Sequence, residues 1–202
     1  MCEYMRILAV SDQVESTLYD HFKKGHFEQP DLILSCGDLA PEYLSFLVTV
    51  FNVPLFYVRG NHDIRYEPDP PGGCTDIDGK IVRFQALNIM GLEGSRWYNG
   101  GPVQYTEKRM KRKIRKFRFK IWRKGGIDIV IAHAPPRNIH DAEDPCHRGF
   151  RSFRHFIDQY APAYFLHGHI HANFTRSAQR VTVVKRTHVI NCFGYYLFEI
   201  KK

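Results

Sequence analysis

The sequence lacks the marks of several large classes of protein. It holds five cysteines in 202 residues and no C-x-x-C pair, so neither a disulfide framework nor a structural zinc site is expected. These cysteines are Cys2, Cys36, Cys74, Cys146 and Cys192. No apolar run approaches the roughly 20 residues of a membrane-spanning helix, and the stretch from Ile7 to Val10 is too short for a secretory signal. We therefore expect a cytoplasmic protein without a membrane span.

Internal repeats, low-complexity tracts and linker-like stretches are also absent from the sequence. Apolar residues make up 44% of the chain and charged residues 25%, which is ordinary for a globular protein and excludes wholesale disorder. A chain of this length buries a full core in one domain. We therefore predict a single domain over residues 1–202.

Charge is abundant but unevenly placed. The chain has 29 basic and 21 acidic residues, and eleven of the basic ones fall between Lys108 and Lys124, where no acidic residue occurs. The rest of the chain, with 18 basic and 21 acidic residues, is mildly acidic. The net charge of +8 therefore belongs to one segment and says little about the core.

The basic segment has the apolar spacing of an amphipathic helix. Its apolar positions are Met110, Ile114, Phe117 and Ile121, with Phe119 and Trp122 broadening the apolar surface. Such a helix can pack on the core with a solvated cationic back. It can also attract a polyanionic substrate, a nucleic acid or an anionic membrane. The pattern leaves these alternatives open.

Apolar strand patterns and helical patterns alternate along most of the chain, which predicts a largely parallel sheet covered on both faces. The expected strands are Met5–Val10, Asp31–Ser35, Leu55–Val58, Lys80–Phe84, Leu87–Leu92, Ile127–Ala132 and Tyr164–Leu166. The expected helices are Glu15–Lys24, Glu42–Phe51 and Phe150–Tyr160. A β-rich C-terminal part is expected to pair antiparallel, through Val181–Val184, Thr187–Ile190 and Tyr195–Ile200.

Five of these strands end directly in polar clusters. The clusters are Asp12, Gly37-Asp38, Gly60-Asn61-His62-Asp63, His133 and Gly168-His169-Ile170-His171. Each cluster alone could be a turn, a helix cap or a surface histidine. Because ligands of open α/β sheets bind beyond the carboxyl ends of the strands, the five together predict one site. Mixed carboxylate, amide and imidazole ligands suit Mn, Fe, Zn or Ni.

The order D…GD…GNHD…H…GHxH, from Asp12 to His171, resembles the calcineurin-like metallophosphoesterase superfamily. The resemblance implies an α/β (α+β) fold, a four-layer αββα sandwich of two mixed β-sheets flanked by helices. It also implies two divalent transition-metal ions bridged by Asp38. The second ion would be held by Asp38, Asn61, His133 and His169, and the first by Asp12, Asp38 and His171.

One position departs from the family pattern. The first family motif is D-x-H, but this chain has Val14 where the histidine would stand. Valine cannot ligate a metal, so we expect the first site to be weak or partly occupied. Gln13, Glu15 or an extra water could compensate, although the turn could also point Glu15 away.

The resemblance implies hydrolysis of a phosphomonoester or phosphodiester by a metal-activated hydroxide, with a small phosphoester or nucleotide as substrate. His62 would protonate or stabilise the leaving group, and Asp63 would hydrogen-bond the ring of His62. Arg59 and Arg137 could meet substrate oxygens or be ordinary surface arginines. A weaker similarity, H-x-P-P…H-x-G from His133 to Gly149, points to the branch with class III cyclic-nucleotide phosphodiesterases.

Two other functions fit the same residues. A nuclease could use the basic 108–124 helix to hold nucleic acid. A relative weakened by the missing histidine could bind a phosphorylated ligand without turnover. The sequence does not determine the oligomeric state.

Overall fold

Two β-sheets face each other in the computed structural model, which describes residues 4–23, 25–172, 174 and 176–201. The first sheet has the order β13 (Gly194–Lys201), β1 (Tyr4–Ser11), β2 (Leu32–Ser35), β3 (Leu55–Tyr57) and β4 (Thr75–Asp76). The second has the order β11 (Val181–Val184), β12 (Thr187–Asn191), β10 (Tyr164–His167), β9 (Ile129–Ala132), β6 (Leu87–Leu92) and β5 (Ile81–Phe84). A small third sheet pairs β7 (Ser95–Arg96) with β8 (Gln104–Tyr105).

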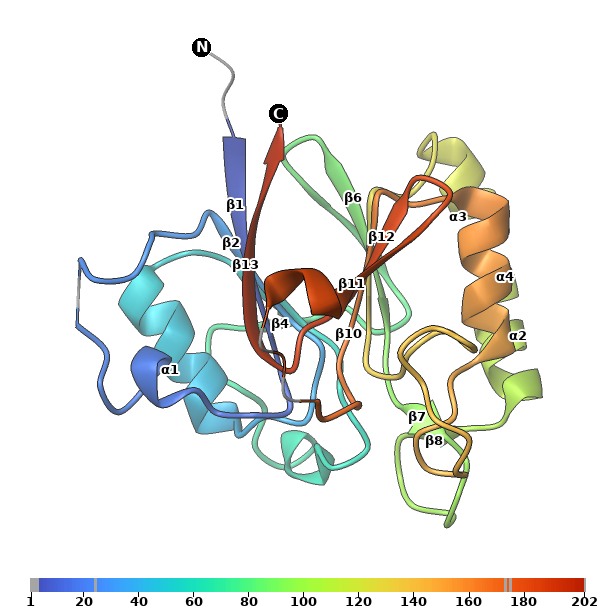
Figure 1. Cartoon of the computed structure of the whole chain (residues 1–202), viewed down its shortest axis with the longest axis horizontal. Helices are drawn as coiled ribbons and strands as arrows, with labels where there is room; N and C mark the ends of the chain where they lie inside the picture. The colour runs from blue at the N-terminus through green and yellow to red at the C-terminus, as the bar shows by residue number, and fades with distance from the viewer. Residues whose placement is uncertain (1–3, 24, 173, 175, 202) are drawn as a thin grey trace.

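Helices cover the outer face of each large sheet (Figure 1). Helix α1 (Pro41–Phe51) packs on the first sheet, and α2 (Glu107–Arg115), α3 (Arg118–Arg123) and α4 (Arg151–Tyr160) lie on the second. Short 3-10 helices cover Ser16–Leu18, Ile64–Tyr66 and Ser177–Arg180. The inner faces of the two sheets form a separate apolar layer. The predicted αββα sandwich of two mixed sheets is therefore confirmed.

Strand β1 shows why the sequence reads as one continuous apolar run. Ile7 and Ala9 face the second sheet, whereas Leu8 and Val10 face the layer of α1. Side chains alternate across a strand, so a strand covered on both sides is apolar at every position. Its last residue, Ser11, precedes Asp12 at the edge where the site forms.

The β-rich C-terminal part is divided between the two sheets. Strands β11 and β12 pair antiparallel as predicted, but β12 continues the second sheet parallel to β10. Strand β13 crosses to the first sheet and pairs antiparallel with β1 along its whole length, from Tyr4 to Ser11. The chain therefore crosses the sandwich between β12 and β13.

The predicted helix Glu15–Lys24 is wrong: only Ser16–Leu18 forms a single 3-10 turn, and Lys24 lies outside the described residues. The two aromatic residues Tyr19 and Phe22 contact Phe46 of α1 edge-on, with ring centroids 4.8 and 6.3 Å apart. These separate contacts bury the segment without a helical face.

The basic segment forms two helices where one was predicted. Met110, Ile114, Phe117 and Ile121 are all buried against the second sheet, so the predicted apolar face is confirmed. The backbone N–H groups of Lys116 and Phe117 bond three residues back, to Lys113 and Ile114, and this tighter turn separates α2 from α3. Within the described part of the chain, no helix has the length and apolar character to cross a membrane.

Candidate metal centre

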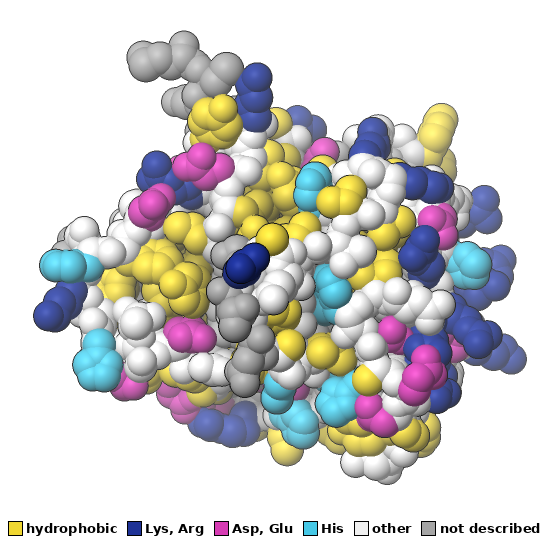
Figure 2. Space-filling view, in the orientation of Figure 1, with side chains coloured by type: hydrophobic (Ala, Val, Ile, Leu, Met, Phe, Trp, Pro, Cys, Tyr) yellow, Lys and Arg dark blue, Asp and Glu magenta, His cyan; other side chains and the backbone are white. Residues whose placement is uncertain are grey.

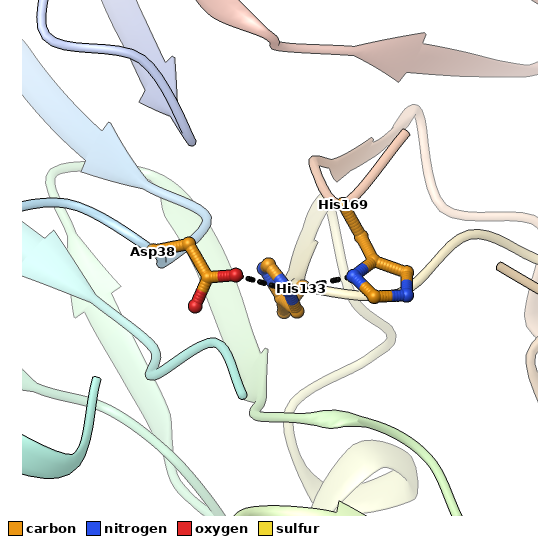
Figure 3. Close-up of side chains that lie close together, drawn as sticks. All are labelled: Asp38, His133 and His169. Carbon is orange, nitrogen blue, oxygen red and sulfur yellow. Dashed lines mark hydrogen bonds and ion pairs between the residues drawn. The ribbon is translucent and has the colours of Figure 1, made fainter. Parts of the chain in front are cut away.

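Three metal-capable side chains from both sheets meet at one edge of the sandwich (Figure 3). Asp38 follows β2 of the first sheet, and His133 and His169 follow β9 and β10 of the second. One ligand atom from each lies within 4.8 Å of the others. The parallel strands thus bring their carboxyl ends to a common point, as the sequence predicted.

His133 is at the centre of this cluster. Its Nε2 atom lies 3.2 Å from Asp38 Oδ2, 3.1 Å from Asn61 Oδ1 and 3.1 Å from His169 Nδ1. The side chain is fully buried, so water does not reach it. One carboxylate oxygen, one amide oxygen and two ring nitrogens therefore converge on a single point.

The second nitrogen of each ring is already used. His133 Nδ1 lies 2.9 Å from the carbonyl oxygen of Cys36, and His169 Nε2 lies 2.8 Å from that of Cys146. A carbonyl can only accept, so these two nitrogens carry the N–H groups, and the inward nitrogens carry lone pairs when both rings are neutral. Lone pairs that face each other without a proton between them fit a cation.

The charges of the cluster balance each other when no ion is bound. Although burial opposes both shifts, the neighbouring opposite charges lower the pKa of Asp38 to about 2 and raise the pKa of His133 to about 9. Burial, and then the charge of His133, lower the pKa of His169 to about 4. A cation bound here would take the place of the His133 proton.

Asp12 and His171 form a second group beside this cluster. Asp12 Oδ2 accepts the backbone N–H of His169 at 2.9 Å, and its Oδ1 lies 3.4 Å from His171 Nε2. Oδ1 is buried and has no hydrogen bond with any described residue. A buried carboxylate oxygen that accepts no hydrogen bond from the described residues and faces a histidine ring at 3.4 Å also fits a cation. The His171 side chain is 64% exposed and packs on Phe193.

Val14 and Glu15 follow Asp12 closely in the sequence but are not part of the group that Asp12 and His171 form. Val14 is 39% exposed. Glu15 lies against Gly194, where a Cβ atom would come within 2.2 Å of Glu15 Oε1. The carboxylate that could have compensated for Val14 thus packs beside the start of β13.

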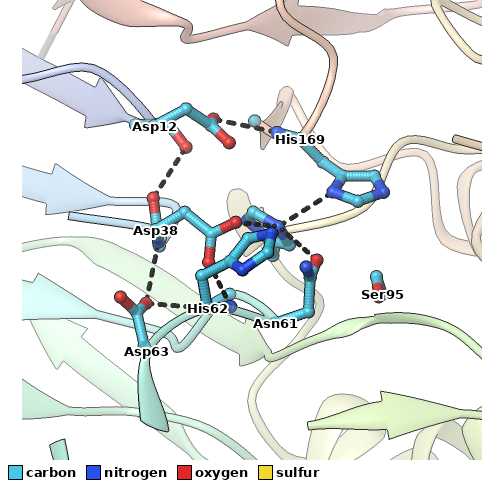
Figure 4. A network of polar contacts seen from close by, with 12 residues as sticks. Asp12, Asp38, Asn61, His62, Asp63, Ser95 and His169 are labelled. Atoms are coloured by element: carbon cyan, nitrogen blue, oxygen red, sulfur yellow. Dashed lines mark hydrogen bonds and ion pairs between the residues drawn. The ribbon is translucent and has the colours of Figure 1, made fainter. Parts of the chain in front are cut away.

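Asp63 stabilises the loop after β3 by hydrogen bonds to the backbone. Its Oδ2 atom accepts the backbone N–H groups of Gly60 and Asp38, both at 2.7 Å, while the N–H of His62 donates to Asp38 Oδ1 at 2.8 Å (Figure 4). Among the described residues, Asp63 makes no hydrogen bond to the ring of His62, so that expectation is wrong. The turn aims two N–H groups at the carboxylate and leaves the exposed His62 ring free. Burial, and then the charge of Asp38, raise the pKa of Asp63 to about 6.

The backbone of the loop after β3 approaches Asp38 so closely that position 60 requires glycine, because a Cβ atom there would lie 2.0 Å from Asp38 Oδ1.

Arg59 and Arg137 are held in ion pairs within the protein. Arg59 Nε donates to Glu93 Oε2 at 2.9 Å. Arg137 bonds Asp141 and Glu143, each at 2.6 Å. Their contact with substrate oxygens stays a prediction.

Two features of the site have no sequence motif. The hydroxyl of Tyr98 lies 3.3 Å from Asn61 Nδ2, from the irregular loop between β7 and β8. Behind the loop of His169, His167 Nε2 bonds His140 Nδ1 at 2.9 Å, and His140 Nε2 bonds Thr182 Oγ1 at 2.8 Å. His140 is therefore a hydrogen-bonding residue of the loop, and its histidine neighbour is not marked by any spacing.

Comparisons with solved structures show that other proteins share this fold. TT1561 of Thermus thermophilus has a similar solved structure, with a TM-score of 0.63 and 14% identity over 100% of this chain and 99% of that one. A dimetal phosphatase from Danio rerio has a TM-score of 0.58 and 10% identity over 94% of this chain and 87% of that one. YfkN from Bacillus subtilis, a calcineurin-like phosphoesterase, has a TM-score of 0.55 and 11% identity over 100% of this chain and 86% of that one.

The sequence has no significant match among curated proteins. The family model of the calcineurin-like phosphoesterases, in contrast, matches residues 5–173. With most of its length matched and the fold shared, the chain belongs to the calcineurin-like phosphoesterase family.

Proposed function

We propose that the chain is a metal-dependent enzyme that hydrolyses a phosphomonoester or a phosphodiester, with an altered first metal site at Val14. The observation that carries this proposal is the pair of inward ring nitrogens of His133 and His169, 3.1 Å apart and each backed by a carbonyl. Two imidazoles fixed in this way cannot hydrogen-bond each other in their neutral form. Membership of the calcineurin-like phosphoesterase family supports hydrolysis of a phosphoester as the reaction.

Two groups of side chains would hold the two ions, and they share Asp38. Asp38, Asn61, His133 and His169 would hold the second ion, and Asp12, Asp38 and His171 the first. When bound, divalent ions supply positive charge for phosphate oxygens and lower the pKa of water to about 7. The ligand set suits Mn, Fe, Zn or Ni.

His62 is the side chain that we assign to the leaving group. Its backbone N–H is fixed on Asp38, and its ring is exposed beside the cluster. Imidazole side chains donate and accept protons near neutral pH. We assign to this ring the transfer of a proton to the leaving oxygen.

A small phosphoester or nucleotide would enter through the hollow of about 220 Å³ that Asp38, His62 and Asp63 help to line. The four described cysteines are free thiols, which suits a reducing cytoplasm. Cys2 lies outside the described residues.

The test is hydrolysis of an aryl phosphomonoester and an aryl phosphodiester by metal-free protein reloaded with one ion at a time. We expect turnover of at least one ester with Mn, Fe, Zn or Ni and none after chelation. His169→Ala supplies the inactive control. Equal rates for the chelated protein, the loaded protein and the variant would contradict the proposal.

A second candidate, binding of a phosphorylated ligand without turnover, is favoured by the position of Glu15 against Gly194. Val14→His tests it. A large gain in turnover over a natural chain that has none would support this candidate, whereas turnover by the natural chain at the rate of the variant would contradict it.

A further inference from the structure

The surface of α2 and α3 carries an unusual excess of free cations. The basic segment from Lys108 to Lys124 holds eleven Lys and Arg residues. Among them only Lys113 is partly buried, and it pairs with Asp78 and Glu93. The other ten are exposed, and none forms an ion pair with any residue that the structure describes. Arginines elsewhere, such as Arg65 and Arg137, pair with carboxylates.

These ten cations repel one another within the helices. Lys108 and Arg112, and likewise Lys111 and Arg115, are four residues apart on α2, so each pair shares one side of the helix. Like charges at this spacing destabilise a helix. A polyanion lying on the surface would remove the repulsion.

Two large aromatic side chains lie among these cations. Phe119 is 64% exposed and Trp122 is 75% exposed, on the same face of α3. Their ring centroids are 5.8 Å apart, with 32° between the ring planes, and the guanidinium of Arg123 lies 6.0 Å from the Phe119 ring. Exposed aromatic rings flanked by cations are the platform on which unpaired bases stack.

A groove of about 630 Å³ between α2 and α4 extends the cationic surface. Its cationic lining is Lys111, Arg115, Arg118 and Arg151. A neighbouring hollow of about 300 Å³ shares Arg151 and His155 and adds Arg154 and Arg137. Figure 2 shows Lys and Arg side chains gathered along the edge formed by these helices.

The acidic residues of the groove are engaged within the protein. Glu107 accepts the backbone N–H groups of Arg151 and Ser152 at the start of α4, at 3.0 and 2.7 Å. Asp158 lies 3.5 Å from Arg154 and 3.8 Å from Lys185. The groove therefore keeps its positive character through Lys111, Arg115, Arg118 and Arg151, whereas Arg137 and Arg154 of the neighbouring hollow pair with carboxylates.

We propose that the α2–α3 surface and the α2–α4 groove bind single-stranded nucleic acid, with phosphates on the cations and bases stacked on Phe119 and Trp122. Stacking needs unpaired bases, which favours a single strand over a duplex. The continuation of the cations along a groove between two helices favours a flexible strand over a flat anionic bilayer. Binding is separate from the proposed hydrolysis and needs no metal ion.

The test is fluorescence anisotropy with a labelled single strand of about 16 nucleotides, with chelator present. Affinity is measured over a range of salt concentrations. We expect log K to fall linearly with log salt, with a slope of about −0.7 for each phosphate neutralised. Because no ion is present, a failure of the hydrolytic function leaves this result unaffected.

Two variants separate stacking from charge. Phe119→Ala with Trp122→Ala should weaken binding by about 30-fold or more, since two stacked bases are lost, and leave the salt slope unchanged. Lys120→Gln with Arg123→Gln should make the salt slope shallower by about 1.4, since two phosphate contacts are lost. The matched control is Lys23→Gln with Arg83→Gln, two cations outside the surface, which should bind like the natural chain. Circular dichroism checks that each variant is folded.

The proposal is overturned if single strands do not bind, or if the control pair weakens binding as much as the α3 pair. It is also overturned if the aromatic variant binds single strands normally but loses binding to vesicles of anionic lipid. That last result would assign the surface to a membrane.

Discussion

The Nε2 atom of His133 and the Nδ1 atom of His169 lie 3.1 Å apart, although each ring donates its other N–H to a carbonyl. Replacing either histidine by alanine should therefore lower affinity for the second ion more than about 100-fold, since losing even an outer partner costs 10- to 100-fold. Calorimetric titration of Mn or Zn into metal-free protein measures this loss. His188→Ala, which removes an exposed imidazole on β12, is the control and should bind as the natural chain does.

His62 differs from these ligands because its ring is exposed while its backbone holds Asp38. His62→Ala keeps the backbone N–H, so the ion should bind as before. Turnover should fall by about 10²- to 10⁴-fold if the ring acts as general acid. Steady-state rates together with metal titration check both parts, and an unchanged rate would exclude the assigned role.

Lys113 and Lys111 lie on the same helix in different surroundings. Lys113 Nζ is 2.6 Å from Asp78 Oδ2 and 3.5 Å from Glu93 Oε1, and its side chain is 17% exposed. Lys113→Ala leaves two carboxylates without this partner and should lower the free energy of unfolding by about 2 kcal/mol. Lys111→Ala removes an exposed cation that has no ion pair with any described residue, and it should change this free energy by less than about 0.5 kcal/mol. Urea unfolding of both variants makes the comparison, and equal losses would contradict the role of the network.

The neutral pair of His140 and His167 makes stability depend on pH. Burial, and then the neighbouring charge of His140, lower the pKa of His167 to about 3, and burial lowers the pKa of His140. Because the unfolded chain takes up these protons at about pH 6.5, stability is full above that value. It should then fall toward pH 3 by at most about 1.4 kcal/mol per pH unit for each histidine.

His140→Asn tests this dependence. Asparagine suits the position because it tolerates a positive φ: the φ of His140 is 58°, and Asn138 adopts a φ of 63° nearby. Urea unfolding between pH 7 and pH 5, where a histidine of the unfolded chain takes up its proton, should give a shallower slope for the variant. An unchanged slope would contradict a neutral His140 in the folded chain.

Much of the fold follows from local patterns. Strands such as β1 and β9 are buried on both faces and are therefore recognised as uninterrupted apolar runs. The polar residues after them mark the carboxyl ends of the strands, which is why the convergence of Asp38, His133 and His169 was predicted, although these strands belong to two sheets and not to one. The pairing of β13 with β1 joins opposite ends of the chain, and no local pattern carries that contact.

The predictions that the structure contradicts also have local causes. Asp63 was expected to bond the His62 ring, but a turn that aims the N–H groups of Gly60 and Asp38 at one carboxylate is a matter of backbone geometry. The break between α2 and α3 arises from hydrogen bonds three residues apart, which the spacing of buried side chains does not reveal. Tyr98 comes from an irregular loop, where periodicity gives no signal.

Tyr98 reaches the cluster through Asn61, whose Nδ2 lies 3.3 Å from the phenol oxygen. The amide N–H donates to that oxygen, which directs Asn61 Oδ1 toward His133 Nε2 at 3.1 Å. Tyr98→Phe removes the acceptor and frees the amide to rotate, so affinity for the second ion should fall by about 10-fold. Trp97→Phe, at an exposed neighbouring position, is the control for changes in the loop. If metal titration gives the same affinity for Tyr98→Phe as for the natural chain, Asn61 is oriented without the phenol.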